Sequence, residues 1–202
     1  MKLSVTDIAR MIDISAVQAS HGKKEIDELV EIAKNNQFIA VHALPSWIPY
    51  LKERAAETDL LVGGPVGFPS GGHTIEVKAM EAKRLADDGV DEMDMMMNIG
   101  KFLSGDYDHV LRDFRAVIDA AGEVPVKLII EAFYLTDDQI KQACELCIEA
   151  GAAFVKTGTG WAAGGATVDQ IRMITDFVGG AIEVKAAGGV RGLAAIAEPS
   201  LI

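Results

Sequence analysis

Two kinds of segment alternate along the sequence. Short apolar runs rich in β-branched residues are followed by longer segments whose apolar residues recur with the 3.6-residue period of a helix. The apolar runs predict strands at 38–44, 60–68, 90–98, 124–132, 152–158 and 181–188, with a further short strand near Met11–Ser15. The periodic segments predict helices at Lys23–Asn36, Ser46–Glu57, Thr74–Asp88, Tyr107–Ala121, Asp137–Ala150 and Val168–Phe177.

Helix-end signals support several of these boundaries. Thr136 with Gln139, and Thr167 with Gln170, fit the capping-box pattern at a helix start. Gly151 stands where the preceding helix is expected to end in a left-handed residue. The helices that follow these signals are therefore predicted with defined ends.

The alternation predicts parallel strands joined by right-handed crossovers. A doubly wound sheet and a (β/α)8 barrel both satisfy it. The barrel is favoured because no GxGxxG follows the first strand, and because polar residues recur near the ends of several strands. The predicted strands end with 181–188, whereas a full barrel typically has about 250 residues. We therefore expect a single domain over residues 1–202, a TIM barrel that lacks the eighth βα unit at its C-terminus.

Composition narrows the function classes. The net charge of −11 argues against a nucleic-acid-binding protein, which needs a basic surface. Cys144 and Cys147 fall on a predicted amphipathic helix, so we interpret them as packed residues rather than a redox or zinc motif, in a reducing compartment. No apolar run approaches about 18 residues, so no membrane span is predicted. A cytoplasmic location is expected.

Carboxylates are predicted on an inward strand face. In the run 90–98, Glu92 and Asp94 share one face, while Met93 and Met95 share the other. The methionines suit a layer packed against helices. The carboxylates then point into the barrel, where they are costly unless they are paired or functional.

Two lysines also lie on predicted strands. Lys156 and Lys185 lie near the C-terminal ends of what we predict to be adjacent strands. Neighbouring strands lie about 5 Å apart, so the two ammonium groups should repel and the pKa of one should fall. A neutral lysine can attack a carbonyl and form an iminium ion, and Asp94 could then move protons. This pattern favours Schiff-base chemistry over two unrelated surface charges.

Glycine-rich turns follow both lysines, at 157–160 and 188–191. Glycine allows backbone N–H groups to close on an anion. Because barrels often bind phosphate after strands seven and eight, these turns are candidates for a phosphate site.

Several segments together resemble the deoxyribose-phosphate aldolase family. They are MID (11–13), GFPSGGHTIEVKAMEAKRLADDGVDEMDM (67–95), NIGKFLSGDY (98–107), VKLIIEAFYLTDDQI (126–140), ACELCIEAGAAFVKTGTG (143–160), GGATVDQIR (164–172) and VKAAGGVR (184–191). The resemblance implies a class I aldolase, a carbon–carbon lyase that reversibly cleaves 2-deoxy-D-ribose 5-phosphate to D-glyceraldehyde 3-phosphate and acetaldehyde. It implies no metal and no cofactor. The implied partners are a small phosphorylated sugar and an aldehyde, with no nucleic acid or membrane, and a homodimer remains open.

The resemblance also implies residue roles. Lys156 corresponds to the Schiff-base lysine, Lys185 to the lysine that tunes it, and Asp94 to the proton relay. The implied substrate-binding residues are Asp13, Ser15, Thr157, Gly160, Gly188 and Gly189.

Some positions depart from the family pattern. His42 stands where Cys is common, Leu44 where Asn is common, and Trp161 where Phe or Lys is often seen. For His42, a packed polar residue is favoured over a new acid–base group. Two alternatives stay open: a Schiff-base aldolase of the same fold with a different aldehyde substrate, and a truncated, inactive barrel that acts as a binding protein.

Overall fold

The computed structural model describes residues 3–189 of the chain. Its centre is one parallel sheet in which seven strands follow the order of the sequence, each hydrogen-bonded to the next. The strands are β1 (Asp13–Ala16), β2 (Ala40–Ala43), β3 (Leu61–Val66), β4 (Glu92–Met96), β5 (Val126–Ile129), β6 (Phe154–Lys156) and β7 (Glu183–Lys185). Each predicted strand is present, with a shorter hydrogen-bonded core than the apolar run suggested.

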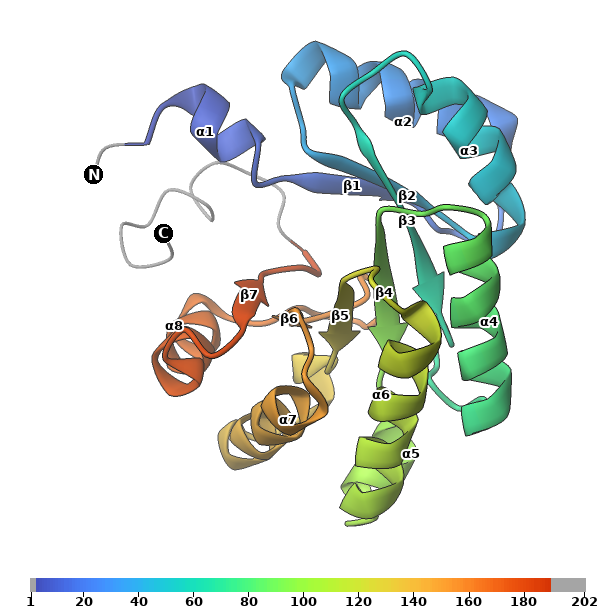
Figure 1. Cartoon of the computed structure of the whole chain (residues 1–202). Helices are drawn as coiled ribbons and strands as arrows, with labels where there is room; N and C mark the ends of the chain where they lie inside the picture. Colours follow the sequence, from blue (N-terminus) through green and yellow to red (C-terminus); the bar gives the residue numbers. More distant parts are fainter. Residues whose placement is uncertain (1–2, 190–202) are drawn as a thin grey trace.

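The sheet curls, and the helices lie on its outer side (Figure 1). The curl brings side chains of the first and last strands together, since Asp13 on β1 pairs with Lys185 on β7. The helices are α1 (Val5–Ala9), α2 (Lys23–Asn36), α3 (Ile48–Ala55), α4 (Ile75–Asp87), α5 (Ile99–Leu103), α6 (Tyr107–Ala121), α7 (Asp137–Ala150) and α8 (Val168–Val178), with short 3-10 turns at η1 (Pro45–Trp47) and η2 (Ala132–Tyr134). This sequential parallel order, with helices outside, is the arrangement of a TIM-barrel-like fold. The predicted absence of an eighth βα unit concerns residues beyond 189, which lie outside the described part.

Local signals account for the helix boundaries. Thr136 and Thr167 each form the predicted capping box, and Gly151 ends α7 in the left-handed region. The bounds of α2, α6 and α7 match the predicted ranges. The short helices α1 and α5 were not predicted, because five residues are too few to show a helical period.

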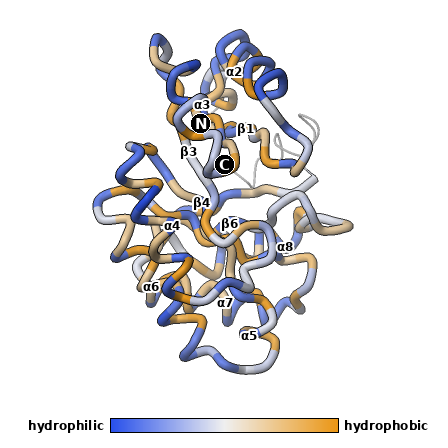
Figure 2. Tube along the Cα trace, turned by 90° about the vertical axis from the view of Figure 1, so that its right-hand side faces the viewer, coloured by the Kyte–Doolittle hydropathy of each residue, from blue (hydrophilic) through white to orange (hydrophobic). Residues whose placement is uncertain are grey.

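The main core lies between the outer face of the sheet and the helices. Met93, Met95 and Met97 are fully buried there, as their alternation with the acidic residues predicted. Cys144 and Cys147 are buried, unbridged residues of α7, which agrees with a packing role. Apolar and polar positions alternate along the outer helices (Figure 2). None of the helices within residues 3–189 combines the length and apolar character needed to traverse a bilayer.

One ion pair lies inside this core. The Lys78 side chain of α4 and the Asp113 side chain of α6 are both fully buried, with Nζ 2.5 Å from Oδ2. Lys78 also donates to the backbone oxygen of Met96 at the end of β4. Burial lowers the pKa of Lys78 and raises that of Asp113, because each charge has lost its water. The pair thus ties two helices to the strand that carries the inward carboxylates.

We expect Lys78→Met to lower the free energy of unfolding by about 3–5 kcal/mol, because it leaves Asp113 as an unpaired buried charge. Urea unfolding at neutral pH measures the change. Lys83→Met is the matched control, since Lys83 lies on the same helix with an exposed side chain. A loss no larger than that of the control would contradict the assigned role of the pair.

Candidate active site

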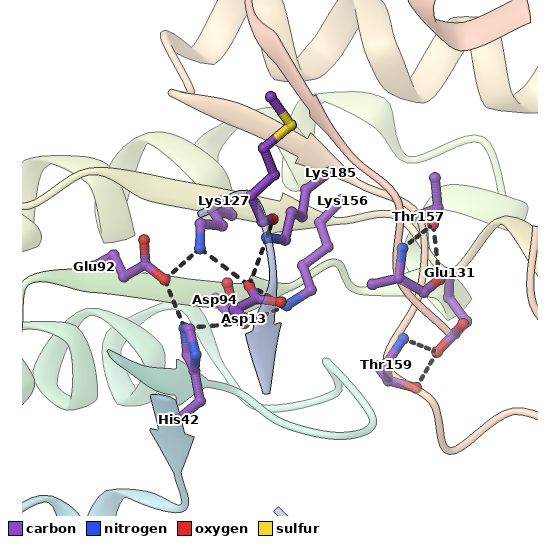
Figure 3. A network of polar contacts seen from close by, with 12 residues as sticks. Asp13, His42, Glu92, Asp94, Lys127, Glu131, Lys156, Thr157, Thr159 and Lys185 are labelled. Atoms are coloured by element: carbon purple, nitrogen blue, oxygen red, sulfur yellow. Dashed lines mark hydrogen bonds and ion pairs between the residues drawn. The ribbon is translucent and has the colours of Figure 1, made fainter. Parts of the chain in front are cut away.

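The inward faces of the strands carry a cluster of opposite charges (Figure 3). Asp94 points inward from β4, and its Oδ2 lies 2.6 Å from Nζ of Lys156 at the end of β6. Both side chains are largely buried, at 8% and 11% exposed. The inward orientation predicted for Asp94 is therefore confirmed, and the carboxylate is paired with the candidate nucleophile.

The carboxylate of Asp13 lies close to the amines of three lysines. Its Oδ2 is 3.2 Å from Nζ of Lys185, 3.4 Å from Nζ of Lys127 and 3.7 Å from Nζ of Lys156. The attraction of these cations outweighs the effect of burial, so the pKa of Asp13 is held well below its usual range. Asp13 is therefore shared by three converging ammonium groups, of which Lys156 is also paired with Asp94.

Lys185 connects the two ends of the sheet. It lies opposite Lys156 in the parallel register of β6 and β7. Its Nζ donates to the backbone oxygen of Met11 at 2.9 Å, in the segment before β1, and pairs with Asp13. Lys185 is thus a contact between the first and last described strands as well as a neighbour of Lys156.

Three further residues complete the cluster. Lys127 of β5 is buried and pairs with Glu92 of β4. Nε2 of His42, on β2, lies 3.1 Å from Oε1 of Glu92 and 3.5 Å from Oδ2 of Asp94. Burial alone would raise the pKa of Glu92, but His42 and Lys127 bring it down to about 2. The sequence did not single out Lys127, although its alternation with Leu128 gave the same inward signal as in the other strands.

The electrostatic prediction for the lysines was half right. The pKa of Lys185 is lowered, by burial first and also by Lys127 and Lys156, against the attraction of Asp13. The pKa of Lys156 is raised instead, because the charges of Asp94 and Asp13 outweigh its burial. The predicted fall in the pKa of one lysine thus occurs at Lys185, whereas the carboxylates near Lys156, which the prediction left out, raise the pKa of that lysine.

A pocket opens above this cluster. It is lined by Asp13, Ser15, Val17, His42, Pro65, Phe68, Asp94, Ile129, Lys156, Gly158 and Thr159. The predicted residues Asp13, Ser15, Asp94 and Lys156 thus share one pocket. A small carbonyl compound placed there would meet the Lys156 amine and the Asp94 carboxylate together.

The described parts of the predicted glycine loops, 157–160 and 188–189, also meet near this end of the sheet, whereas 190 and 191 lie outside the described residues. Gly160 and Gly188 both have positive φ, of 77° and 89°, which favours glycine. A Cβ on Gly188 would lie 3.7 Å from the Gly160 nitrogen, and a Cβ on Gly165 would overlap the Gly188 oxygen. Gly189 follows with a φ of 83°. A side chain is excluded by close contact only at Gly165, whereas Gly160, Gly188 and Gly189 are favoured as glycines by their positive φ.

Thr157 is hydrogen-bonded to the backbone of Ala187. Its hydroxyl donates to the Ala187 oxygen at 2.8 Å and accepts from the Ala187 nitrogen at 2.9 Å. The side chain is 1% exposed. Thr157 therefore joins the ends of β6 and β7, and its predicted contact with substrate remains a prediction.

Metal binding is disfavoured by the charges around the candidate set that residues 3–189 contain. Ligand atoms of Asp13, His42 and Glu92 lie within 4.8 Å of one another. The same carboxylates are already paired with Lys127 and Lys185. A cation would have to displace these ammonium groups, so the set is better suited to moving protons than to holding a metal.

Aromatic residues shape the rim of the pocket. Phe68, which lines it, packs edge-to-face on Trp161 with ring centroids 5.9 Å apart. Trp161 lines a second pocket of about 440 Å³ with Tyr134 and Thr159. The departure at position 161 therefore places an indole beside the entrance.

Comparisons with known proteins identify similar sequences and similar folds. Residues 10–198 match the DeoC/LacD family of aldolases. A deoxyribose-phosphate aldolase of Rhizobium meliloti is 49% identical over 196 residues, covering 96% of this chain and 79% of that protein. The solved structure of an aldolase called QR15 has a TM-score of 0.90 at 35% identity, covering 96% of this chain and 86% of that one. A tetrameric deoxyribose phosphate aldolase from Aeropyrum pernix has a TM-score of 0.85 at 26% identity, covering 94% of this chain and 80% of that one.

Proposed function

The chain belongs to the DeoC/LacD family of aldolases, and from that premise we propose that it reversibly cleaves 2-deoxy-D-ribose 5-phosphate. The products are D-glyceraldehyde 3-phosphate and acetaldehyde. The observation that carries the proposal is the contact of 2.6 Å between the Lys156 amine and Asp94 in a buried pocket. This contact supports the proposal, because carbonyl condensation requires an amine with a proton acceptor beside it.

In the proposed mechanism, Lys156 Nζ attacks the aldehyde carbon of the sugar once it has lost a proton. Loss of water then gives an iminium ion joined to Lys156. The iminium accepts the electron pair of the bond between C2 and C3 as that bond breaks, and the C3 hydroxyl loses its proton. Asp94 is the carboxylate placed to carry protons in these steps. Protonation of the remaining enamine and hydrolysis release acetaldehyde and restore the amine.

The other predicted residues have supporting roles in this proposal. Lys185 and Asp13 set the charge around Lys156, because they meet it in one cluster. Ser15 lines the pocket and is proposed to contact a sugar hydroxyl. Gly160, Gly188 and Gly189 are proposed to hold the phosphate through their backbone N–H groups.

We propose that the sheet forms the larger part of a (β/α)8 barrel within a single domain. Seven sequential parallel strands and the contact of Lys185 with Asp13 support this. A different aldehyde substrate is a second candidate, favoured by the indole of Trp161 packed on Phe68 at the pocket rim.

Trapping with borohydride tests the proposal directly. With acetaldehyde present, reduction should leave an ethyl group on the peptide that contains Lys156, as seen by mass spectrometry. The same preparation should release glyceraldehyde 3-phosphate from deoxyribose 5-phosphate. An unmodified Lys156 would overturn the Schiff-base mechanism. An adduct without cleavage of deoxyribose 5-phosphate would favour the alternative substrate or an inactive barrel.

A further inference from the structure

We propose that His42 receives, through Asp94, the proton that Lys156 loses before it attacks a carbonyl. The inference rests on the proposed function, because it concerns the activation of the same amine. His42 would work through Asp94 and need not touch the substrate.

The need for such an acceptor follows from the charges at Lys156. The carboxylates of Asp94 and Asp13 stabilise its ammonium form, whereas attack on a carbonyl requires the neutral amine. A proton passed to Asp94 alone would remain 2.6 Å away and would return readily. A second acceptor beside Asp94 would hold the proton while the new carbon–nitrogen bond forms.

The imidazole of His42 is placed to be that acceptor. It is 2% exposed, and its Nε2 lies 3.5 Å from the Asp94 oxygen that contacts Lys156. Within the described residues this buried nitrogen has no partner with hydrogen-bond geometry. Imidazole also exchanges protons near neutral pH more readily than other common side chains.

Two carboxylates flank the imidazole. Glu92 Oε1 lies 3.1 Å from Nε2, so an imidazolium would stand between two carboxylates. In the transfer, a Lys156 N–H proton moves to Asp94 Oδ2, and a proton passes from Asp94 to His42 Nε2. Lys156 becomes neutral, Asp94 is again a carboxylate, and His42 carries the positive charge. The total charge of the cluster does not change.

The absence of a side chain at Gly63 leaves room for the imidazole of His42. His42 lies opposite Gly63 in the register of β2 and β3, and Gly63 lies opposite Glu92 in that of β3 and β4. A Cβ on Gly63 would overlap the imidazole ring. The missing side chain therefore lets His42 reach across β3 to the carboxylates of β4.

The test is the rate at which the acetaldehyde adduct of Lys156 forms in single-turnover trapping, measured against pH. For the unaltered protein we expect this rate to fall toward acid, because attack on the carbonyl requires the neutral amine. For His42→Gln we expect a rate about 10²-fold lower near neutral pH. That rate should recover steadily toward alkaline pH, because bulk base then removes the proton instead.

The other charged groups facing His42 remain in the variant, so they contribute to both profiles. They are Asp13 on β1, Glu92 and Asp94 on β4, Lys127 on β5, Lys156 on β6 and Lys185 on β7. A structural defect would instead lower the rate equally at every pH.

Gly63→Ala provides an independent test, because it displaces the imidazole without removing it. It should reproduce the altered pH profile, and adding it to His42→Gln should cause little further loss. His109→Gln is the matched control, since His109 lies on the outer helix α6 and should leave the profile unchanged.

The outcomes separate the two proposals. Absence of any adduct in the unaltered protein would defeat the proposed function itself. A normal adduct there, combined with an unchanged profile shape in His42→Gln, would overturn only the role given to His42.

Discussion

Replacing Lys156 with methionine should abolish turnover, with kcat reduced by a factor on the order of 10⁴ or more. The methionine keeps most of the side-chain length but has no amine, so neither the Schiff base nor its reduced adduct can form. The measurement is cleavage of deoxyribose 5-phosphate together with mass spectrometry after borohydride treatment. Lys141→Met, on the outer helix α7, is the control for a lysine replaced elsewhere.

A second variant separates chemistry from folding. Lys156→Met leaves the buried Asp94 without its cation, which can destabilise the protein. Lys156→Arg keeps a positive charge beside Asp94 but cannot condense with an aldehyde. We expect a folded and inactive protein. Substantial turnover by the arginine variant would refute the assignment of Lys156 as the nucleophile.

Asp94→Asn should reduce kcat by at least about 10²-fold. The amide matches the carboxylate in size but accepts no proton at neutral pH. It also removes the nearer of the two charges that stabilise the ammonium form of Lys156, at 2.6 Å from Nζ. We therefore expect the pKa of Lys156 to fall, so that binding of the aldehyde is retained while proton transfer fails.

Kinetics with substrate, and with acetaldehyde under borohydride, measure these effects. KM should change little, and the adduct should still accumulate, more slowly than in the unaltered protein. Asp138→Asn changes an exposed carboxylate on α7 and is the control. An Asp94→Asn enzyme with near-normal kcat would remove Asp94 from the proposed mechanism.

The sequence predicted the fold well where its signals are local. Capping boxes at Thr136 and Thr167 and the alternation in 90–98 depend only on neighbouring residues, and the structure confirms them. The short helices α1 and α5 show no such period. The curl of the sheet follows from the repetition of strands and helices, which the sequence also displays.

The site could be predicted only in part because its energetics depend on distant pairs. Asp13 and Lys127 are 114 positions apart in the chain, yet their side chains pair inside the sheet. Judging Lys156 and Lys185 as an isolated pair of cations left out the carboxylates, so the sequence did not indicate that Asp94 and Asp13 raise the pKa of Lys156. The orientation of His42 likewise depends on the empty space at Gly63, which lies on another strand.

The contacts of Lys185 with Asp13 and Met11 have a mechanical consequence. Within the described residues, β1 and β7 are connected by the Lys185 amine rather than by backbone hydrogen bonds between the two strands. The strength of that contact varies with the protonation of Lys185 and Asp13, and salt weakens it little because both side chains are largely buried. A condition that weakens the contact of Lys185 with Asp13 would separate the ends of β1 and β7. It would also change the charges around Lys156, because Asp13 lies near that amine as well. We therefore expect the stability of the contact between β1 and β7 and the reactivity of Lys156 to change together.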